Sequence, residues 1–159
     1  MREIKFRGKQ IDNGEWVYGS LIGSDVIVGD IIEFTEEYFN CEYWWRVKPE
    51  TVGQYTGLKD SKRTEEYPEG QEIYEGDIIK CLNVNGEDIK TKRVVVFQKG
   101  YFLGLYIDES RNQYEEFLRN KDLTAGWYDD IPVLNAGLED SLIIGNIYEN
   151  PELINQLKK

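Results

Sequence analysis

Three β-rich segments in close succession are the feature that most constrains the fold of this chain. They lie between residues 77 and 107, and Asn85-Gly86 and Lys99-Gly100 stand between them. An Asn-Gly pair between apolar segments is the strongest short-range signal for a β-hairpin, because both residues tolerate positive φ angles. Strands that are joined by turns this short pair in the antiparallel sense. The region is therefore predicted to form an antiparallel meander.

The fold class predicted from these segments is mainly β with minor α content. We expect a small SH3-like antiparallel barrel, formed by about residues 51–107 and 141–150. The strands that precede it pack on the barrel or form a second sheet. The chain length suits one ordinary domain, so we expect a single compact unit over residues 1–159. Within it, residues 1–50 are a possible N-terminal β subdomain, and residues 51–159 are the barrel-containing part.

Two peripheral helices are predicted. A helical insertion covers about residues 108–123, and Asp108 or Ser110 is a candidate cap for it. The apolar face of this insertion comprises Tyr114, Phe117 and Leu118. A C-terminal helix is expected over residues 151–159, because Asn150 is a favourable N-cap residue and a proline follows it.

The net charge limits the range of partners. The chain has 30 acidic and 19 basic residues, which gives a formal net charge of −11. This charge repels phosphate backbones and anionic membranes, so nucleic acid is an unfavoured partner and no membrane is expected. Residues 1–10 are locally basic. The acidic excess has two readings: a solvated surface that keeps the protein soluble, or a surface that engages a basic partner or imitates nucleic acid.

The cysteines and the N-terminus indicate a cytoplasmic protein. Cys41 and Cys81 do not form a C-x-x-C pair, so both are expected to be reduced and structural. The first residues are charged and contain no apolar signal segment. No apolar run approaches the length that crosses a bilayer.

The absence of histidine removes several kinds of catalytic site. Without His, the commonest general base is missing, and Ser–His and Cys–His pairs cannot form. Zinc sites that need imidazole are excluded as well. The phosphate-binding pattern G-x-x-x-x-G-K-[ST] does not occur. No catalytic residue, cofactor or metal site is therefore predicted.

An acidic cluster between residues 65 and 77 is the remaining place where catalysis could arise. Glu75 and Asp77 belong to it, and paired carboxylates can act in glycoside hydrolysis or bind divalent metals. In a chain with 30 acids, however, chance clusters are common. A solvated loop next to a strand edge is the simpler interpretation, with Asp77 accepting hydrogen bonds from turn amides.

Aromatic residues supply the other candidates. Trp44 and Trp45 are adjacent, so in a strand their side chains point to opposite faces. One is expected in the core, and the other at the surface, at an interface or under a neighbouring element. An exposed aromatic patch would favour protein binding. The candidate interaction or motif residues are Trp16, Tyr18, Trp44, Trp45, Tyr55, Tyr74, Glu75 and Asp77.

Five motifs occur in a characteristic order. They are IKFRGK at 4–9, GEWVYG at 14–19, TVGQYTGLKD at 51–60, EIYEGDIIK at 72–80 and IIGNIYENPELI at 143–154. In this set the chain resembles the YopX family of phage and prophage proteins. The resemblance implies a protein that acts inside a host bacterial cell, and it brings no known activity and no catalytic residues. The segment SKRTEEYPEG lengthens the usual turn before EIYEGD, so that loop is not expected to carry a shared function.

Three hypotheses on function follow. The leading one is a non-catalytic phage accessory protein that binds another protein, of the host or of the phage, and that also self-associates. The second is a nucleic-acid-related protein, either a weak binder that uses the basic N-terminal segment or an acidic mimic of DNA. The third is a carboxylate- or metal-dependent enzyme that uses Glu75 and Asp77.

Overall fold

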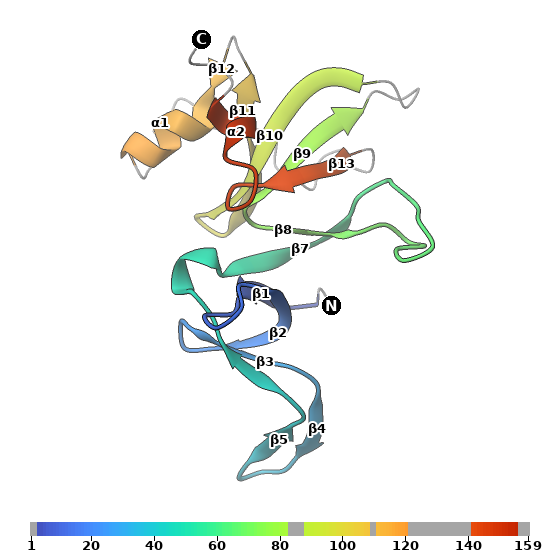
Figure 1. The fold of residues 1–159 in the computed structure, drawn as a ribbon, viewed down its shortest axis with the longest axis vertical. Helices are drawn as coiled ribbons and strands as arrows, with labels where there is room; N and C mark the ends of the chain where they lie inside the picture. The colour runs from blue at the N-terminus through green and yellow to red at the C-terminus, as the bar shows by residue number, and fades with distance from the viewer. Residues whose placement is uncertain (1–2, 83–87, 109–110, 121–140, 156–159) are drawn as a thin grey trace. The chain divides into compact units, whose positions relative to one another are not determined.

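A computed structural model describes residues 3–82, 88–108, 111–120 and 141–155. The chain divides into two units, Met1–Gly57 and Leu58–Lys159. Strands make up most of the described residues, and two small helices accompany them (Figure 1). The predicted fold class, mainly β with minor α, is confirmed. Within the described part of the chain, no helix is long and apolar enough to cross a membrane.

The first unit is built on an antiparallel sheet. In sheet order its strands are β6 (Trp44–Arg46), β3 (Val26–Val28), β2 (Trp16–Ile22), β1 (Phe6–Lys9) and β7 (Gly53–Lys59). Alternation along β2 and β3 turns Val17 and Ile27 inward, where they form a core with Val47. Gly19 is required in β2, because a Cβ atom there would collide with the carbonyl oxygen of Val28. The expected N-terminal strands therefore pair with one another, in a sheet that β7 extends.

A separate hairpin stands between β3 and β6 in the chain. It consists of β4 (Ile31–Phe34) and β5 (Phe39–Cys41), which pair with each other as a two-stranded sheet. Thr35 closes its turn: its amide donates to the carbonyl of Tyr38 at 2.9 Å, and its hydroxyl accepts from the amide of Tyr38 at 3.0 Å. Figure 1 shows the hairpin extending from β3 beyond the remainder of this unit. A short 3-10 helix, Pro49–Thr51, then leads to β7.

The second unit is built on a five-stranded antiparallel sheet that curls into a half-barrel. In sheet order its strands are β12 (Arg111–Asn112), β11 (Tyr101–Asp108), β10 (Asp88–Gln98), β9 (Asp77–Leu82) and β13 (Ser141–Asn146). The predicted meander of β9, β10 and β11 is confirmed, and β13 pairs with β9 as the last strand. One face of the sheet buries Ile78, Val94 and Leu105, and the other buries Ile79 and Val95.

The half-barrel begins later in the chain than expected. The prediction placed residues from 51 onward in the barrel, but β7 pairs with β1 in the sheet of the first unit, where Phe6 lies opposite Gln54. The amide of Tyr55 donates to the carbonyl of Lys5 in the same pairing, at 2.8 Å. Beyond Gly57, β7 continues into the second unit, where β8 (Glu72–Tyr74) is its neighbour. β1 is far away in sequence, so local patterning could not reveal this pairing.

The helix α1 (Gln113–Asn120) is shorter than the predicted insertion. Its cap is Asn112, whose Oδ1 accepts a hydrogen bond from the amide of Glu115 at 2.9 Å. The predicted cap Asp108 is wrong, because its Oδ1 accepts from the amide of Lys92 in the sheet. On the predicted apolar face, Tyr114 and Phe117 pack against the core but Leu118 is exposed.

The helix α2 (Glu152–Asn155) covers the first turn of the predicted C-terminal helix. Asn150 precedes it, and its side-chain oxygen accepts a hydrogen bond from the amide of Asn146 at 3.2 Å. The cap candidate Ser110, the Asn85-Gly86 turn, residues 121–123 of the helical insertion and residues 156–159 lie outside the described residues.

Candidate functional site

The motif turn between β8 and β9 holds three of the predicted site residues, Tyr74, Glu75 and Asp77. Asp77 is 2% exposed, and its Oδ2 accepts a hydrogen bond from the amide of Tyr74 at 2.7 Å. Gly76 adopts a φ of +87°, which glycine tolerates best, and its amide donates to the carbonyl of Val95 at 2.8 Å. Asp77 therefore closes the turn, as the structural interpretation of this acid predicts.

The remaining groups of this turn make similar contacts. Glu75 is half-buried, and its Oε1 accepts from the amide of Phe97 at 3.4 Å. Tyr74 is buried, and its hydroxyl donates to Oε2 of Glu72 at 2.6 Å. Among the described residues, no three His, Cys, Asp or Glu side chains come together to hold a metal ion. The hydrogen bonds of Tyr74, Glu75 and Asp77 thus hold the turn together.

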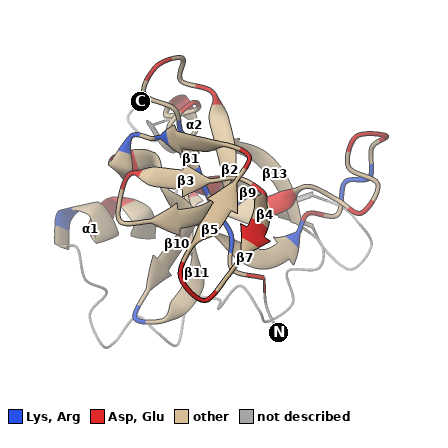
Figure 2. Cartoon of the chain, turned by 90° about the horizontal axis from the view of Figure 1, so that it is seen from below, with Lys and Arg blue, Asp and Glu red and all other residues tan. Residues whose placement is uncertain are grey.

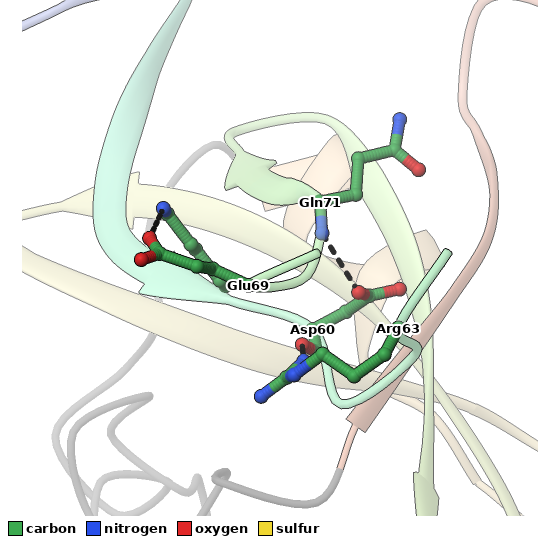
Figure 3. A network of polar contacts seen from close by, with 5 residues as sticks. Asp60, Arg63, Glu69 and Gln71 are labelled. Carbon is green, nitrogen blue, oxygen red and sulfur yellow. Dashed lines mark hydrogen bonds and ion pairs between the residues drawn. The ribbon is translucent and has the colours of Figure 1, made fainter. Parts of the chain in front are cut away.

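The loop that follows β7 is organised around Asp60 (Figure 3). One carboxylate oxygen of this buried acid accepts from the amide of Gln71 at 2.9 Å, and the other accepts from the amide of Ile143 at 3.3 Å. A guanidinium nitrogen of Arg63 donates to the carbonyl oxygen of Asp60 at 2.6 Å. These contacts tie both ends of the loop to each other and to β13.

The glutamates of the same loop remain at its surface. Glu65 and Glu66 line a shallow hollow of about 500 Å³, together with Lys62 and Tyr67. Further along the loop, Lys59 and Glu69 form an ion pair at 2.8 Å (Figure 3). The hydrogen bond from Lys59 lowers the pKa of the Glu69 carboxyl. The acidic cluster predicted over residues 65–77 is therefore divided between an exposed loop and a buried turn.

Trp16 lies against the basic N-terminal strand. The guanidinium carbon of Arg7 is 4.6 Å from the ring centroid of Trp16, and the Lys9 ammonium is 5.3 Å from it. Cations at these distances are attracted to the face of an indole ring. Arg7 is 6% exposed, so this cation faces the ring of its own chain and offers little surface to a phosphate.

The predicted tyrosines of the first unit differ in exposure. Tyr55 is buried in β7, whereas Tyr18 is exposed on β2. Trp44 and Trp45 lie on opposite faces of β6, as predicted. Trp45 packs against the core of the first unit and stacks on Tyr43 with ring centroids 5.9 Å apart. Trp44 is 61% exposed, and it borders a shallow hollow of about 360 Å³ that Ile11 also lines.

Among the described residues, several exposed apolar side chains lie together on the hairpin, where the sequence patterns predict no site. Cross-strand partners in a sheet share a face, and so do residues two apart in a strand. Ile31 lies opposite Cys41 and Phe34 lies opposite Phe39, while a bulge between Ile31 and Glu33 shifts the register. Ile32 is two residues from Phe34 and therefore shares its face, and the bulge brings Ile31 to that face as well. We call this the apolar face; it comprises Ile31, Ile32, Phe34, Phe39 and Cys41.

The apolar face is exposed to solvent. Phe34 is 78% exposed and Ile32 is 68% exposed, and Ile31 and Phe39 are exposed as well. The opposite face carries Glu33, which accepts a hydrogen bond from the side-chain amide of Asn40. The hairpin is therefore amphipathic, and its apolar face is exposed to solvent as its polar face is. Large contiguous apolar patches on soluble proteins mark interaction sites.

A sequence signal for this face does exist. The segment IIEFTEEYFNC has apolar residues on both sides of a polar turn. By local pattern, its first half belongs to the end of the β-branched segment DVIVGDIIEF, and its second half to the start of the aromatic segment YFNCEYWWRV. The bulge hides the pattern, because it breaks the strict alternation that identifies a half-buried strand. The exposure of the face is a tertiary property.

Two kinds of comparison bear on the identity of the chain. A family model described as YopX protein matches residues 5–155. No curated protein and no solved structure matches the chain.

Proposed function

The chain belongs to the YopX protein family, and we propose that it is a phage or prophage accessory protein that binds another protein without catalysis. Its binding surface is the apolar face of the β4–β5 hairpin, extended by the exposed Trp44. The observation that carries this proposal is the exposure of Ile32 and Phe34 on a two-stranded sheet. An isolated hairpin has few contacts of its own, and a partner that covers the apolar face would stabilise it.

The composition of the surface supports protein binding over the alternatives. Aromatic residues are enriched at the centres of protein interfaces, and Phe34, Phe39 and Trp44 are all exposed. The basic strand of the first unit packs on its own Trp16, which weighs against nucleic-acid binding. Glu75 and Asp77 accept hydrogen bonds from backbone amides, which weighs against the carboxylate enzyme.

The test is reconstitution with a purified partner. Wild-type protein and the variant Phe34→Ser are used as baits in host and phage extracts, and each retained protein is purified and its Kd is measured. We expect at least one partner whose affinity falls by about tenfold or more in the variant, as for a central aromatic contact. A matched variant, Tyr101→Ser, changes an exposed aromatic of the second unit and should bind normally.

The proposal fails if every purified partner binds Phe34→Ser as tightly as wild type. It also fails if no direct partner is found in extracts of a host that carries the phage. Circular dichroism of the variant shows whether the fold is retained, which is expected because Phe34 is highly exposed.

A further inference from the structure

The charges of the hairpin restrict what can cover its apolar face. Residues 30–43 contain five acids and no Lys or Arg (Figure 2), and all five acids are exposed. They are Asp30, Glu33, Glu36, Glu37 and Glu42. Glu36 and Glu37 lie in the turn, and Asp30 and Glu42 lie at the base, where the amide of Glu42 donates to the carbonyl of Asp30 at 3.0 Å. Acids therefore stand at both ends of the apolar face.

The local field at the base is negative. The pKa of the Tyr43 hydroxyl is raised, first by its hydrogen bond to Glu42, next by desolvation and then by the charge of Asp30. The nearest arginine in the chain, Arg46, forms an ion pair with Asp25. Within residues 30–43, the negative charge is not balanced by a cation of the hairpin itself.

These charges disfavour a second copy of the chain as the occupant. Two copies related by a two-fold axis could place their apolar faces together either tip to tip or tip to base. In the first arrangement, Glu36 and Glu37 meet their own copies. In the second arrangement, they meet Asp30 and Glu42 of the other copy. Both arrangements bring acids against acids, and juxtaposed like charges oppose association.

We infer that the occupant of the apolar face is a basic amphipathic segment of another protein, with apolar side chains flanked by Lys or Arg. This inference rests on the proposed function and specifies the partner. The apolar side chains of the segment would cover Ile32, Phe34 and Phe39. Its cations would lie near Glu36 and Glu37 at the tip, or near the acids at the base. Complementary charge of this kind steers association and rejects acidic partners.

A set of synthetic peptides tests the inference. The probe is a fluorescent peptide of about ten residues that alternates Val with Lys, long enough to span the hairpin. Two control peptides alternate Val with Glu and Ser with Lys. We expect the Val–Lys peptide to bind, the Val–Glu peptide not to bind, and the Ser–Lys peptide to bind more weakly. Binding of the Val–Lys peptide should weaken as salt is added.

Matched charge-reversal variants test which acids contribute to binding of the Val–Lys peptide. The double variant Glu36→Lys/Glu37→Lys should weaken Val–Lys binding by about tenfold or more. The control Glu65→Lys/Glu66→Lys makes the same change of charge in the exposed loop of the second unit, and it should have little effect. Cys41 lies on the apolar face, whereas Cys81 is buried, so bound peptide should slow alkylation of Cys41.

Different failures have different meanings. If the Val–Glu peptide binds as tightly as the Val–Lys peptide, or if both double variants weaken binding equally, the inference is overturned and the hairpin remains a protein-binding surface. A concentration-dependent dimer that Phe34→Ser abolishes would assign the face to a second copy and overturn it as well. If the Val–Lys peptide binds but Phe34→Ser has no effect, or if no peptide binds, the inference also falls. The Kd of the purified partner for wild type and for Phe34→Ser then decides whether the proposed function is retained.

Discussion

The turn at residues 74–77 and the hairpin at residues 31–41 contain similar residue types but use them in opposite ways. Each combines β-strand ends with aromatic rings and carboxylates. In the turn, Asp77 and Tyr74 are buried, and the carboxylate accepts a hydrogen bond from a backbone amide. In the hairpin, the aromatic rings and the acids are exposed to solvent.

The contrast shows that residue type alone does not distinguish a structural motif from an interaction surface. The turn belongs to one of the motifs that carry the YopX resemblance, and its residues stabilise the start of the half-barrel. The hairpin lies outside the five motifs, and its apolar face stabilises nothing in the described part of its own chain. Four predictions test this difference between buried residues that stabilise the fold and exposed residues of the hairpin.

The largest effect is expected for Phe102→Ala in the half-barrel. Phe102 is buried in a core with Ile79 and Val95, so truncation removes apolar contacts and leaves a cavity. The free energy of unfolding of the second unit should fall by about 3–5 kcal/mol. Urea denaturation followed by hydrogen exchange of the β9 and β10 amides measures this loss. A loss below about 1 kcal/mol would mean that this core is not packed as described.

The next largest effect is expected for Asp77→Ala. The substitution removes the acceptor of the Tyr74 amide in a buried turn, and should reduce the free energy of unfolding by about 2–3 kcal/mol. Asp77→Asn keeps a side-chain oxygen and should lose less. The same denaturation experiment applies. Equal losses in both variants would show that charge matters more than the hydrogen bond, and would reopen a functional role for this acid.

A smaller effect is expected from alkaline pH. Burial raises the pKa of the Cys81 thiol above its ordinary value of 9.0, so the folded chain keeps a proton that the unfolded chain loses. This contribution to stability is present below pH 9.0 and is lost as the pH rises further. The free energy of unfolding should decline less steeply above pH 9 in Cys81→Ala than in wild type. Identical slopes would contradict the assignment.

The smallest effect on stability is expected for Phe34→Ala in the hairpin. This is the same change as Phe102→Ala, made where the ring is exposed, and the free energy of unfolding should change by no more than about 0.5 kcal/mol. Near-ultraviolet circular dichroism and urea denaturation provide the measurement. A loss of several kcal/mol would show that the ring is covered within the chain, and would remove the basis of the proposed interaction surface.

Much of the fold could be predicted because its signals are local. Alternation and turn residues located β9, β10 and β11, and Gly76 and Asp77 marked the bend before β9. The residues of the candidate site are harder to predict from the sequence. The division of Trp44 and Trp45 between two faces follows from strand geometry, but which of them is buried depends on the strands that pack nearby. Asp, Ser and Asn are all favourable N-cap residues, so the sequence does not distinguish Asn112, the cap of α1, from Asp108 and Ser110.

The sequence by itself determined where strands and turns form, because φ preferences and side-chain alternation act within a few residues. It also determined the acidic character of the hairpin. Only the tertiary structure decided that β7 pairs with β1, that Asp77 is buried, and that the apolar face at Ile32 and Phe34 has no cover among the described residues. Burial depends on contacts between segments that are distant in the chain, and a local pattern of residues does not specify them.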